Sequence, residues 1–281
     1  MVEALLEARN VVKQYGTVRA LQGTDFSAYA GTVTALIGDN GAGKSTLVKC
    51  LSGVAMPDGG EIFLDGQRIL LDSPTSAQRL GIETVYQDLA LAYDLDAAAN
   101  LYLGRELRRP GLLGMLGVLD KAAMRNGGAG ALANLGVRLP AADAPVGSLS
   151  GGQRQSIAVA RAVAWASRVI FMDEPTAALG VVQRERVLEV IRRVRDSGVA
   201  VVLISHNMPE VLAVADRIEV LRLGRRVARF AAGDVDVEDL VGAMTGALEA
   251  SALGANDVEA NDVEAGAQTG GEGNTNGGNG R

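Results

Sequence analysis

The chain has 281 residues, of which 48% are apolar and 21% are charged, so it can form a core and is neither a disordered nor a fibrous chain. Its single cysteine and single histidine exclude an intrachain disulfide framework and a multi-histidine metal site. The net charge is −6, and the segment beyond residue 246, with six carboxylates and one arginine, accounts for most of it, so residues 1–246 are nearly neutral. A nearly neutral chain with only 4% aromatic residues argues against a nucleic-acid partner.

The first part of the chain, up to about residue 87, is predicted to be rich in β-strands. A helix is expected to begin at Lys44, and the pair Asp65 and Gly66 is typical of a turn. Short apolar or alternating runs, separated by glycines, indicate strands at residues 6–12, 24–29, 32–37, 61–64 and 82–86.

The middle part, from about residue 88 to residue 164, is predicted to be helical. Helices are expected at residues 96–103 and 121–135, with a glycine-rich loop at residues 110–117 between them. A third helix is expected over residues 151–165. Its apolar side chains are spread around the helix, which is the pattern of a buried helix.

Strands and helices alternate from residue 168 onward. A strand is expected at residues 168–172, a helix at residues 181–195 and a second strand at residues 199–204. The last of these is apolar throughout, which suits a parallel sheet that is covered on both faces. The alternation predicts an α/β fold with a helical insertion.

The tail at residues 247–281 has a different composition from the rest of the chain. It repeats the sequence Ala-Asn-Asp-Val-Glu and then becomes rich in glycine and asparagine. Because it has too little apolar surface to offset the entropy of ordering, we expect it to be disordered and acidic, following a folded domain at residues 1–246.

No stretch has the length of a membrane span or the order of a signal peptide. The longest apolar run, residues 111–119, is less than half of the roughly 20 residues that a spanning helix needs, and the N-terminus is acidic. We therefore expect a soluble, cytoplasmic chain.

A phosphate-loop pattern, G-x-x-x-x-G-K-[S/T], follows the predicted strand at residues 32–37 and precedes a predicted helix. Its glycines let backbone N–H groups point at phosphate oxygens, Lys44 would reach the β- and γ-phosphates, and Ser45 would bind Mg²⁺. Kinases, GTPases and transport ATPases share this pattern. The expected nucleotide site consists of Gly38, Asn40, Gly41, Gly43, Lys44, Ser45 and Thr46.

The sequence LSGGQ at residues 149–153 lies about a hundred residues after the phosphate loop and about twenty before an apolar strand that ends in two carboxylates. Alone, it would be an ordinary helix start capped by Ser150. The three features in this order resemble the ATP-binding subunit of ABC transporters, over residues 4–246. The resemblance implies a P-loop NTPase core, with a mixed sheet flanked by helices, an antiparallel β subdomain, and an α-helical subdomain at about residues 88–164.

The resemblance also implies roles for single residues. Asp173 would hold Mg²⁺, through water, and Glu174 would polarise the water that attacks ATP. Gln87 would contact Mg²⁺ or that water, His206 would contact the γ-phosphate, and Tyr15 would stack on adenine. The ATP site of a second subunit would be completed by the signature residues Ser150, Gly151, Gly152 and Gln153.

One position departs from the usual pattern of the family. The loop after the acidic strand commonly ends in an aspartate that helps to join the two subunits, and here it ends in Gly180. Glycine at this point also occurs in a subset of the sugar importers that this chain resembles. The departure concerns the coupling geometry between subunits rather than the activity.

The partners follow from the same resemblance. It implies a dimer of ATPase subunits, in which a second copy of this chain is expected, at the cytoplasmic face of the cell membrane. Separate multi-span permease subunits would hold it there, and an extracytoplasmic solute-binding protein would act indirectly. Residues 86–102 and 111–119 are the candidates for the permease contact, and the alternative is that they pack within the helical insertion.

The kind of importer is read from short stretches. Those that resemble the monosaccharide importer ATPases lie at residues 38–41, 176–180, 204–208, 221–225 and 244–246. Alternatives are import of another small solute, a non-transport ABC ATPase that acts on ribosomes or DNA, and a nucleotide-binding regulator without turnover.

Overall fold

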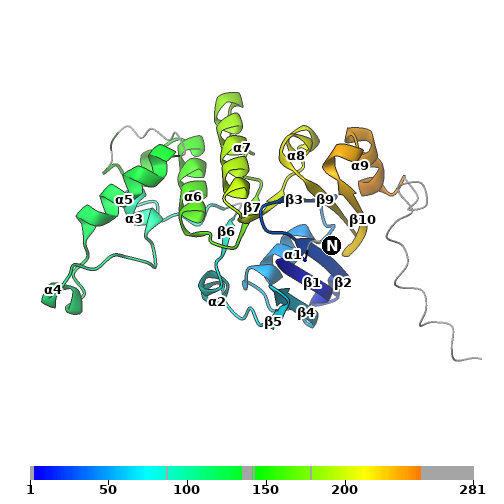
Figure 1. Cartoon of the computed structure of the whole chain (residues 1–281), viewed down its shortest axis with the longest axis horizontal. Coiled ribbons are helices and arrows are strands. Elements are labelled where there is room, and N and C mark those ends of the chain that lie inside the picture. The colour runs from blue at the N-terminus through cyan, green and yellow to red at the C-terminus, as the bar shows by residue number, and fades with distance from the viewer. Residues whose placement is uncertain (1–2, 87, 135–140, 142, 178, 248–281) are drawn as a thin grey trace, which may run out of the picture.

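The structure is a computed structural model that describes residues 3–86, 88–134, 141, 143–177 and 179–247. Its centre is a six-stranded mixed sheet (Figure 1). The strands across this sheet are β10 (Arg225–Ala231), β9 (Arg217–Arg222), β3 (Val33–Ile37), β8 (Ala200–Ile204), β7 (Val169–Asp173) and β6 (Ile82–Val85). Strands β9 to β6 are parallel to one another, and β10 is antiparallel to β9.

The central strands are buried on both faces, as the apolar run at residues 199–204 predicts. In β8, Val201 and Leu203 belong to one apolar cluster, while Val202 and Ile204 belong to another on the opposite face. Side chains alternate between the faces of a strand, so each face of the sheet has its own core. The first core contains helices α6 (Gly151–Trp165) and α7 (Val181–Asp196), and the second contains α1 (Lys44–Leu51).

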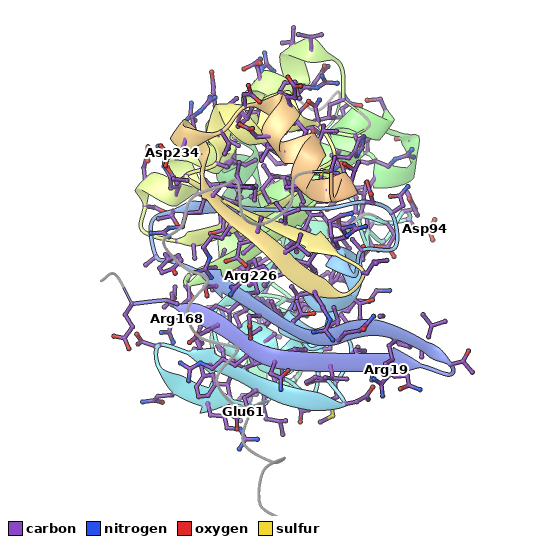
Figure 2. The ribbon with its side chains drawn as sticks, turned by 90° about the vertical axis from the view of Figure 1, so that its right-hand side faces the viewer. Arg19, Glu61, Asp94, Arg168, Arg226 and Asp234 are labelled. Atoms are coloured by element: carbon purple, nitrogen blue, oxygen red, sulfur yellow. The ribbon has the colours of Figure 1, made fainter. Side chains whose placement is uncertain are left out.

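A four-stranded antiparallel sheet covers the second core. Its strand order is β2 (Val18–Ala28), β1 (Leu6–Tyr15), β4 (Gly59–Leu64) and β5 (Gln67–Ile69). The predicted turn at Asp65 and Gly66 joins β4 to β5, and both of its residues have positive φ angles. Figure 2 shows β10 close to this sheet, with Arg226 labelled where the two sheets approach each other.

Helical segments between β6 and β7 form a separate layer beside the sheet (Figure 1). In this layer α6 packs against α3 and α5, and also against β6. Its other helices are α3 (Ala97–Leu101), α4 (Leu112–Met115) and α5 (Lys121–Asn134), with a 3-10 turn η1 (Val146–Ser148) before α6.

The remaining elements complete the edges of the molecule. A third apolar cluster lies between β9 and the helices α8 and α9. These elements are α2 (Pro74–Arg79), α8 (Met208–Val214), the 3-10 turn η2 (Ala232–Asp234) and α9 (Val237–Thr245).

The predicted elements agree with the structure in type at most positions. The expected fold class, an α/β P-loop core with an antiparallel sheet and a helical insertion, is confirmed. The prediction of a loop at residues 110–117 is wrong at its centre, because Gly111 adopts φ 73° and α4 follows directly. Strands β5, β9 and β10 and helices α2, α8 and α9 were not predicted from the sequence.

Two expectations concern the chain ends and the membrane. The acidic tail falls outside the described residues, apart from Ala247. Throughout the described ranges, each helix is either too short or too polar to cross a bilayer.

Candidate functional site

Three loops meet at one edge of the central sheet. Ile204 in β8 is paired with Leu36 in β3 on one side and with Asp173 in β7 on the other. These strands are parallel, so the loops that follow them leave the sheet at the same edge, where ligands of open α/β sheets bind. The phosphate loop begins at Gly38, Glu174 directly follows β7, and His206 lies two residues after the end of β8.

Glycine is required in the phosphate loop for two different reasons. A Cβ at Gly38, whose φ is +149°, would collide with the carbonyl oxygen of Leu221, and a Cβ at Gly43 would lie 2.7 Å from that of Ala20. A Cβ at Gly41 would meet open space, and there only the φ of +84° disfavours other residues. The loop is therefore tightly packed at its two ends and open in its middle.

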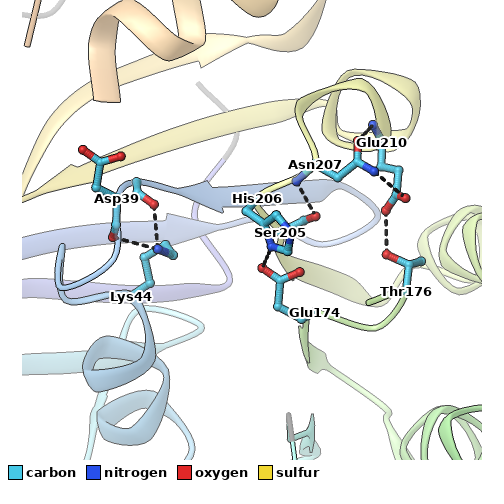
Figure 3. Close-up of polar contacts among 9 residues, drawn as sticks. Asp39, Lys44, Glu174, Thr176, Ser205, His206, Asn207 and Glu210 are labelled. Carbon is cyan, nitrogen blue, oxygen red and sulfur yellow. Dashed lines mark hydrogen bonds and ion pairs between the residues drawn. The ribbon is translucent and has the colours of Figure 1, made fainter. Parts of the chain in front are cut away.

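Lys44 begins α1 and folds back over the loop. Its Nζ donates hydrogen bonds to the carbonyl oxygens of Gly38, at 2.6 Å, and of Asp39, at 3.0 Å (Figure 3). Burial lowers the pKa of Lys44, and the nearby carboxylates of Glu174 and Asp173 oppose this effect. The lysine thus stands between the phosphate loop and the two acids.

The first turn of α1 is open to a ligand. Gly43 occupies the N-cap position without a side-chain cap, and the turn contains no acidic residue. Ser45 and Asn40 are exposed and Thr46 is half-buried. The free N–H groups of such a turn, with the helix dipole, favour an anion.

The two acids occupy different environments at the end of β7. Burial raises the pKa of Asp173, and the neighbouring carboxylate of Glu174 adds to the increase. Glu174 has a φ of +50°, which is unusual for a residue with a side chain, and its N–H donates to the carbonyl oxygen of Ile204 at 2.9 Å. Its Oε1 lies 2.7 Å from Nδ1 of His206, whose side chain is 75% exposed (Figure 3).

The signature segment forms the start of α6. The Ser150 side chain accepts from the N–H of Gln153 at 3.3 Å, and the Gln153 side chain accepts from the N–H of Ser150 at 2.9 Å. This pair is a capping box. Gly151 has open space around it, whereas a Cβ at Gly152 would approach Leu179 to 3.2 Å. Both Ser150 and Gly151 are exposed, so their surface is available to another molecule.

Tyr15 ends β1 at the hairpin that leads to β2. It is paired with Val18, and its ring is 47% exposed. The Lys13 ammonium lies 5.5 Å from the ring centroid. The structure therefore presents an exposed aromatic face, and a flat ligand has access to it.

Gln87 lies outside the described residues, but the segment that follows it is anchored by a residue that sequence reasoning missed. Arg161 in α6 donates from Nη1 to the carbonyl oxygen of Ala90, at 2.7 Å, and from Nη2 to that of Leu89, at 3.0 Å. Both of these residues have positive φ angles. A cation within the apolar second half of α6, residues 157–165, is the sequence signal that could have identified it, because such a charge needs partners.

Gly180 begins α7 as its N-cap and has no side chain to cap the helix. Its φ of −70° and ψ of 166° are open to any residue. A Cβ there would approach only the end of the flexible Gln183 side chain, at 2.9 Å. Glycine at this position is therefore not required by the backbone.

The fold and the three converging loops define a phosphate-loop nucleotide-binding protein. Residues 21–177 match the ABC transporter family. The chain is 52% identical over 249 residues to the fructose import ATP-binding protein FrcA of Rhizobium meliloti, and this match covers 88% of this chain and 96% of that one. It is 44% identical to the xylose/arabinose import ATP-binding protein XylG of Sulfolobus acidocaldarius, with 86% and 94% covered.

A third relative is longer than this chain. The ribose import ATP-binding protein RbsA 1 of Rubrobacter xylanophilus is 43% identical, over 86% of this chain and 47% of that one. The chain belongs to the ABC transporter family of ATP-binding proteins, and it is an ABC-type ATPase. The resemblance that the sequence motifs indicate is confirmed.

Solved structures agree on the fold. An ATP-binding cassette crystallised without nucleotide is 24% identical, with a TM-score of 0.72 over 85% of this chain and 96% of that chain. The ADP conformation of another cassette is 25% identical, with a TM-score of 0.70 over 86% and 95%. A dimeric cassette bound to ADP and Pi, in a post-hydrolysis state, is 24% identical, with a TM-score of 0.70 over 81% and 98%.

Proposed function

We propose that this chain is the ATP-hydrolysing subunit of an importer for a monosaccharide. The observation that carries this proposal is the convergence of Lys44, Glu174 and His206 at one sheet edge, in a chain whose relatives are named for the import of fructose and of xylose or arabinose. Both relatives match this chain over nearly their whole length.

The nucleotide would lie along the phosphate loop and the first turn of α1. Lys44 would exchange its two carbonyl partners for the β- and γ-phosphate oxygens, which are stronger acceptors. The N–H groups of Ser45 and Thr46 would complete the phosphate cradle, beside Gly41 and Asn40. The exposed ring of Tyr15 would stack on the adenine.

The residues present fit a magnesium ion. The Ser45 hydroxyl and the Asp173 carboxylate are hard oxygen donors, and Mg²⁺ commonly takes one or two protein ligands besides phosphate and water. Burial and the neighbouring charge of Glu174 raise the pKa of Asp173, and a bound cation would offset the cost of ionising it. Within the described residues there is no cluster of three His, Cys, Asp or Glu ligands. Gln87 is the further oxygen donor that we assign to this ion. When bound, Mg²⁺ would neutralise charge on the phosphates.

Glu174 and His206 would act on the γ-phosphate. A water oxygen forms a bond to the γ-phosphorus, the bond from that phosphorus to the bridging oxygen breaks, and ADP leaves with the electron pair. The water proton passes to the Glu174 carboxylate, and His206 donates a hydrogen bond to the transferred phosphoryl group. The 2.7 Å contact between the two side chains would keep both groups at the same point.

A second copy of the chain would complete the site. The signature carries the exposed residues Ser150 and Gly151 and the half-buried Gly152, and the capping box fixes Gln153 next to them. We assign these groups to the γ-phosphate of ATP bound by the other subunit. The dimeric state named for a structural neighbour supports this arrangement. Closure of the dimer around ATP would then be the step that drives transport.

The permease contact is assigned to the helical layer at the cytoplasmic face of the membrane. Helix α4 and the residue after it expose apolar residues, among them Leu112, Met115 and Leu116, which are 73%, 84% and 73% exposed. Figure 1 shows α4 at the far end of the helical layer. Apolar surface of this kind marks interaction sites. The permease would link the ATPase to a solute-binding protein on the other side of the membrane.

The test is affinity purification of tagged Glu174→Gln protein from its native membranes with ATP, followed by mass spectrometry. The variant lacks the carboxylate that accepts the proton, so the closed dimer should persist and retain its partners. We expect a multi-span permease to co-purify, and its solute-binding protein to bind a monosaccharide. The control is a Lys44→Ala variant, which should not bind ATP. Recovery of ribosomal proteins or DNA without a permease would contradict the importer.

A further inference from the structure

A buried carboxylate lies behind the candidate site and belongs to none of the sequence motifs. Glu210, in α8, is 7% exposed, and Figure 3 shows it between Thr176 and Asn207. Its Oε2 accepts from the Thr176 hydroxyl at 2.6 Å, and its Oε1 accepts from Nδ2 of Asn207 at 2.8 Å. Nε of Arg184, in α7, lies 3.0 Å from the same Oε1.

Two of these partners, Thr176 and Asn207, belong to the two loops that carry the reacting groups. Thr176 lies two residues after Glu174 in the loop that follows β7. Asn207 is adjacent to His206 and caps α8, where its side chain accepts from the N–H of Glu210 at 3.4 Å. One carboxylate therefore joins the loop of Glu174 to the loop of His206, on the side away from their direct contact.

The site needs such a connection because its geometry is strained. Glu174 is held at a φ of +50°, a conformation that costs free energy and persists only where the surroundings fix it. His206 is 75% exposed at its side chain, so little packing restricts the ring. Besides the bond from the Glu174 N–H to the carbonyl oxygen of Ile204, the hydrogen bonds of Thr176 and Asn207 to Glu210 connect the two loops.

We infer that Glu210 is a positioning residue, which fixes the Glu174 and His206 side chains relative to each other by tying together the loops after β7 and β8. The inference rests on the roles proposed above for Glu174 and His206. It predicts that the Thr176 hydroxyl affects ATP turnover, although Thr176 is buried and lies far from the phosphate loop in the sequence.

The sharpest test removes one hydroxyl. Thr176→Val keeps the volume of the side chain and leaves Oε2 of Glu210 without its donor, whereas Thr176→Ser keeps the hydroxyl. We expect kcat for ATP hydrolysis by the purified chain to fall roughly tenfold or more in the valine variant, the effect of a misplaced reacting group, with little change in KM. The serine variant should stay close to the wild type.

A second measurement reads the geometry without any catalysis. His206 is the only histidine of the chain, so its ring nitrogens give isolated ¹⁵N signals in protein prepared without a histidine tag. Thr176→Val should shift these signals and Thr176→Ser should not. A control is Ser197→Ala, which removes a hydroxyl bonded to the carbonyl oxygen of Val194 at the other end of α7.

The outcomes separate the two proposals. If Thr176→Val hydrolyses ATP as the wild type does and leaves the His206 signals in place, the positioning role is wrong, whatever Glu174→Gln does. If Glu174→Gln keeps full activity while Thr176→Val shifts the His206 signals, the positioning stands and the role of Glu174 is wrong. Neither assay needs a sugar or a permease, so failure of the importer proposal does not affect them.

Discussion

Glu174 and His206 lie 32 positions apart in the chain, yet their side chains meet at 2.7 Å. The contact follows from the sheet, because Glu174 continues β7 and His206 follows β8, and these strands are parallel neighbours with Asp173 opposite Ile204. An exposed histidine and a largely buried carboxylate are thereby held at the mouth of the phosphate loop, although neither residue is in that loop.

The phosphate loop should respond differently to alanine at two of its glycines. Gly38→Ala would drive a Cβ into the carbonyl of Leu221 at a φ of +149°, so we expect it to abolish ATP binding and to reduce folding stability. A Cβ at Gly41 would meet open space, so Gly41→Ala should lower the free energy of unfolding only by the backbone strain, about 1–2 kcal/mol. Chemical denaturation and titration with a fluorescent ATP analogue test both variants. Equal effects at the two positions would contradict the packing argument.

The stability of the nucleotide-free protein should depend on the protonation of Asp173. Its folded pKa is raised, first by burial and then by Glu174, so the folded state holds this proton more tightly than the unfolded state does. That contribution to stability is present below the ordinary carboxyl pKa and is lost as pH rises through the raised pKa.

Asp173→Asn removes this dependence, so the variant should melt at a higher temperature than the wild type near neutral pH. The advantage should shrink on going from about pH 7.5 to about pH 4.5, towards the ordinary carboxyl range. Thermal unfolding without nucleotide or Mg²⁺ is the measurement. A variant that melts below the wild type at neutral pH would show that Asp173 is not under electrostatic strain.

Among the arginines of β10, we expect Arg229 to contribute most to folding stability through its ion pair. It places Nη2 at 3.0 Å and Nε at 3.1 Å from Oε1 of Glu219, a carboxylate that is 1% exposed and whose pKa is raised by burial. Arg229→Ala would leave Glu219 with Arg226 as its remaining cation at 3.7 Å, and we expect a loss of about 3 kcal/mol in unfolding free energy.

Two variants and a change of pH check this assignment. Arg225→Ala, an exposed position on the same strand, should change stability little. Adding Glu219→Gln to Arg229→Ala should recover part of the loss, because no charge is then left buried. Since the raised pKa of Glu219 favours its neutral form at low pH, the loss should be greater at about pH 7.5 than at about pH 5. A loss that is independent of pH would point to packing instead.

Gly180→Asp should be tolerated by the fold. The position has an extended backbone, only the flexible end of the Gln183 side chain would have to move, and an aspartate would cap α7, so we expect a small gain in stability of a few tenths of a kcal/mol. Any change in ATP-dependent dimerisation, measured by analytical ultracentrifugation in the Glu174→Gln background, would then come from the new carboxylate at the subunit boundary. A marked loss of stability would mean that the loop requires glycine.

The elements with clear apolar patterns could be predicted from the sequence, and the site could be predicted largely from its motifs. The helix after the phosphate loop begins at Lys44 and the third helix of the insertion spans Gly151–Trp165, as expected. Strand β10 was missed because half-exposed arginines interrupt its apolar residues. Helices α2 and α8 were missed because each is short and begins with a proline or has one in its first turn.

The contacts that support the site could not be predicted in the same way. Nothing local in the sequence links Glu210 to Thr176 or Arg161 to Leu89, because each pair is brought together by the packing of helices on the sheet. Gln87 and the acidic tail are outside the described residues, so their roles stay predictions.

The most direct test is steady-state ATP hydrolysis by the purified chain, compared with Glu174→Gln and Lys44→Ala under the same conditions with Mg²⁺. We predict that Glu174→Gln binds ATP as the wild type does but turns it over at least about a hundredfold more slowly, because a positioned base contributes about 10²–10⁴-fold. Lys44→Ala should lose binding as well. Wild-type turnover in the Glu174→Gln variant would contradict the assignment of the catalytic carboxylate and the site built around it.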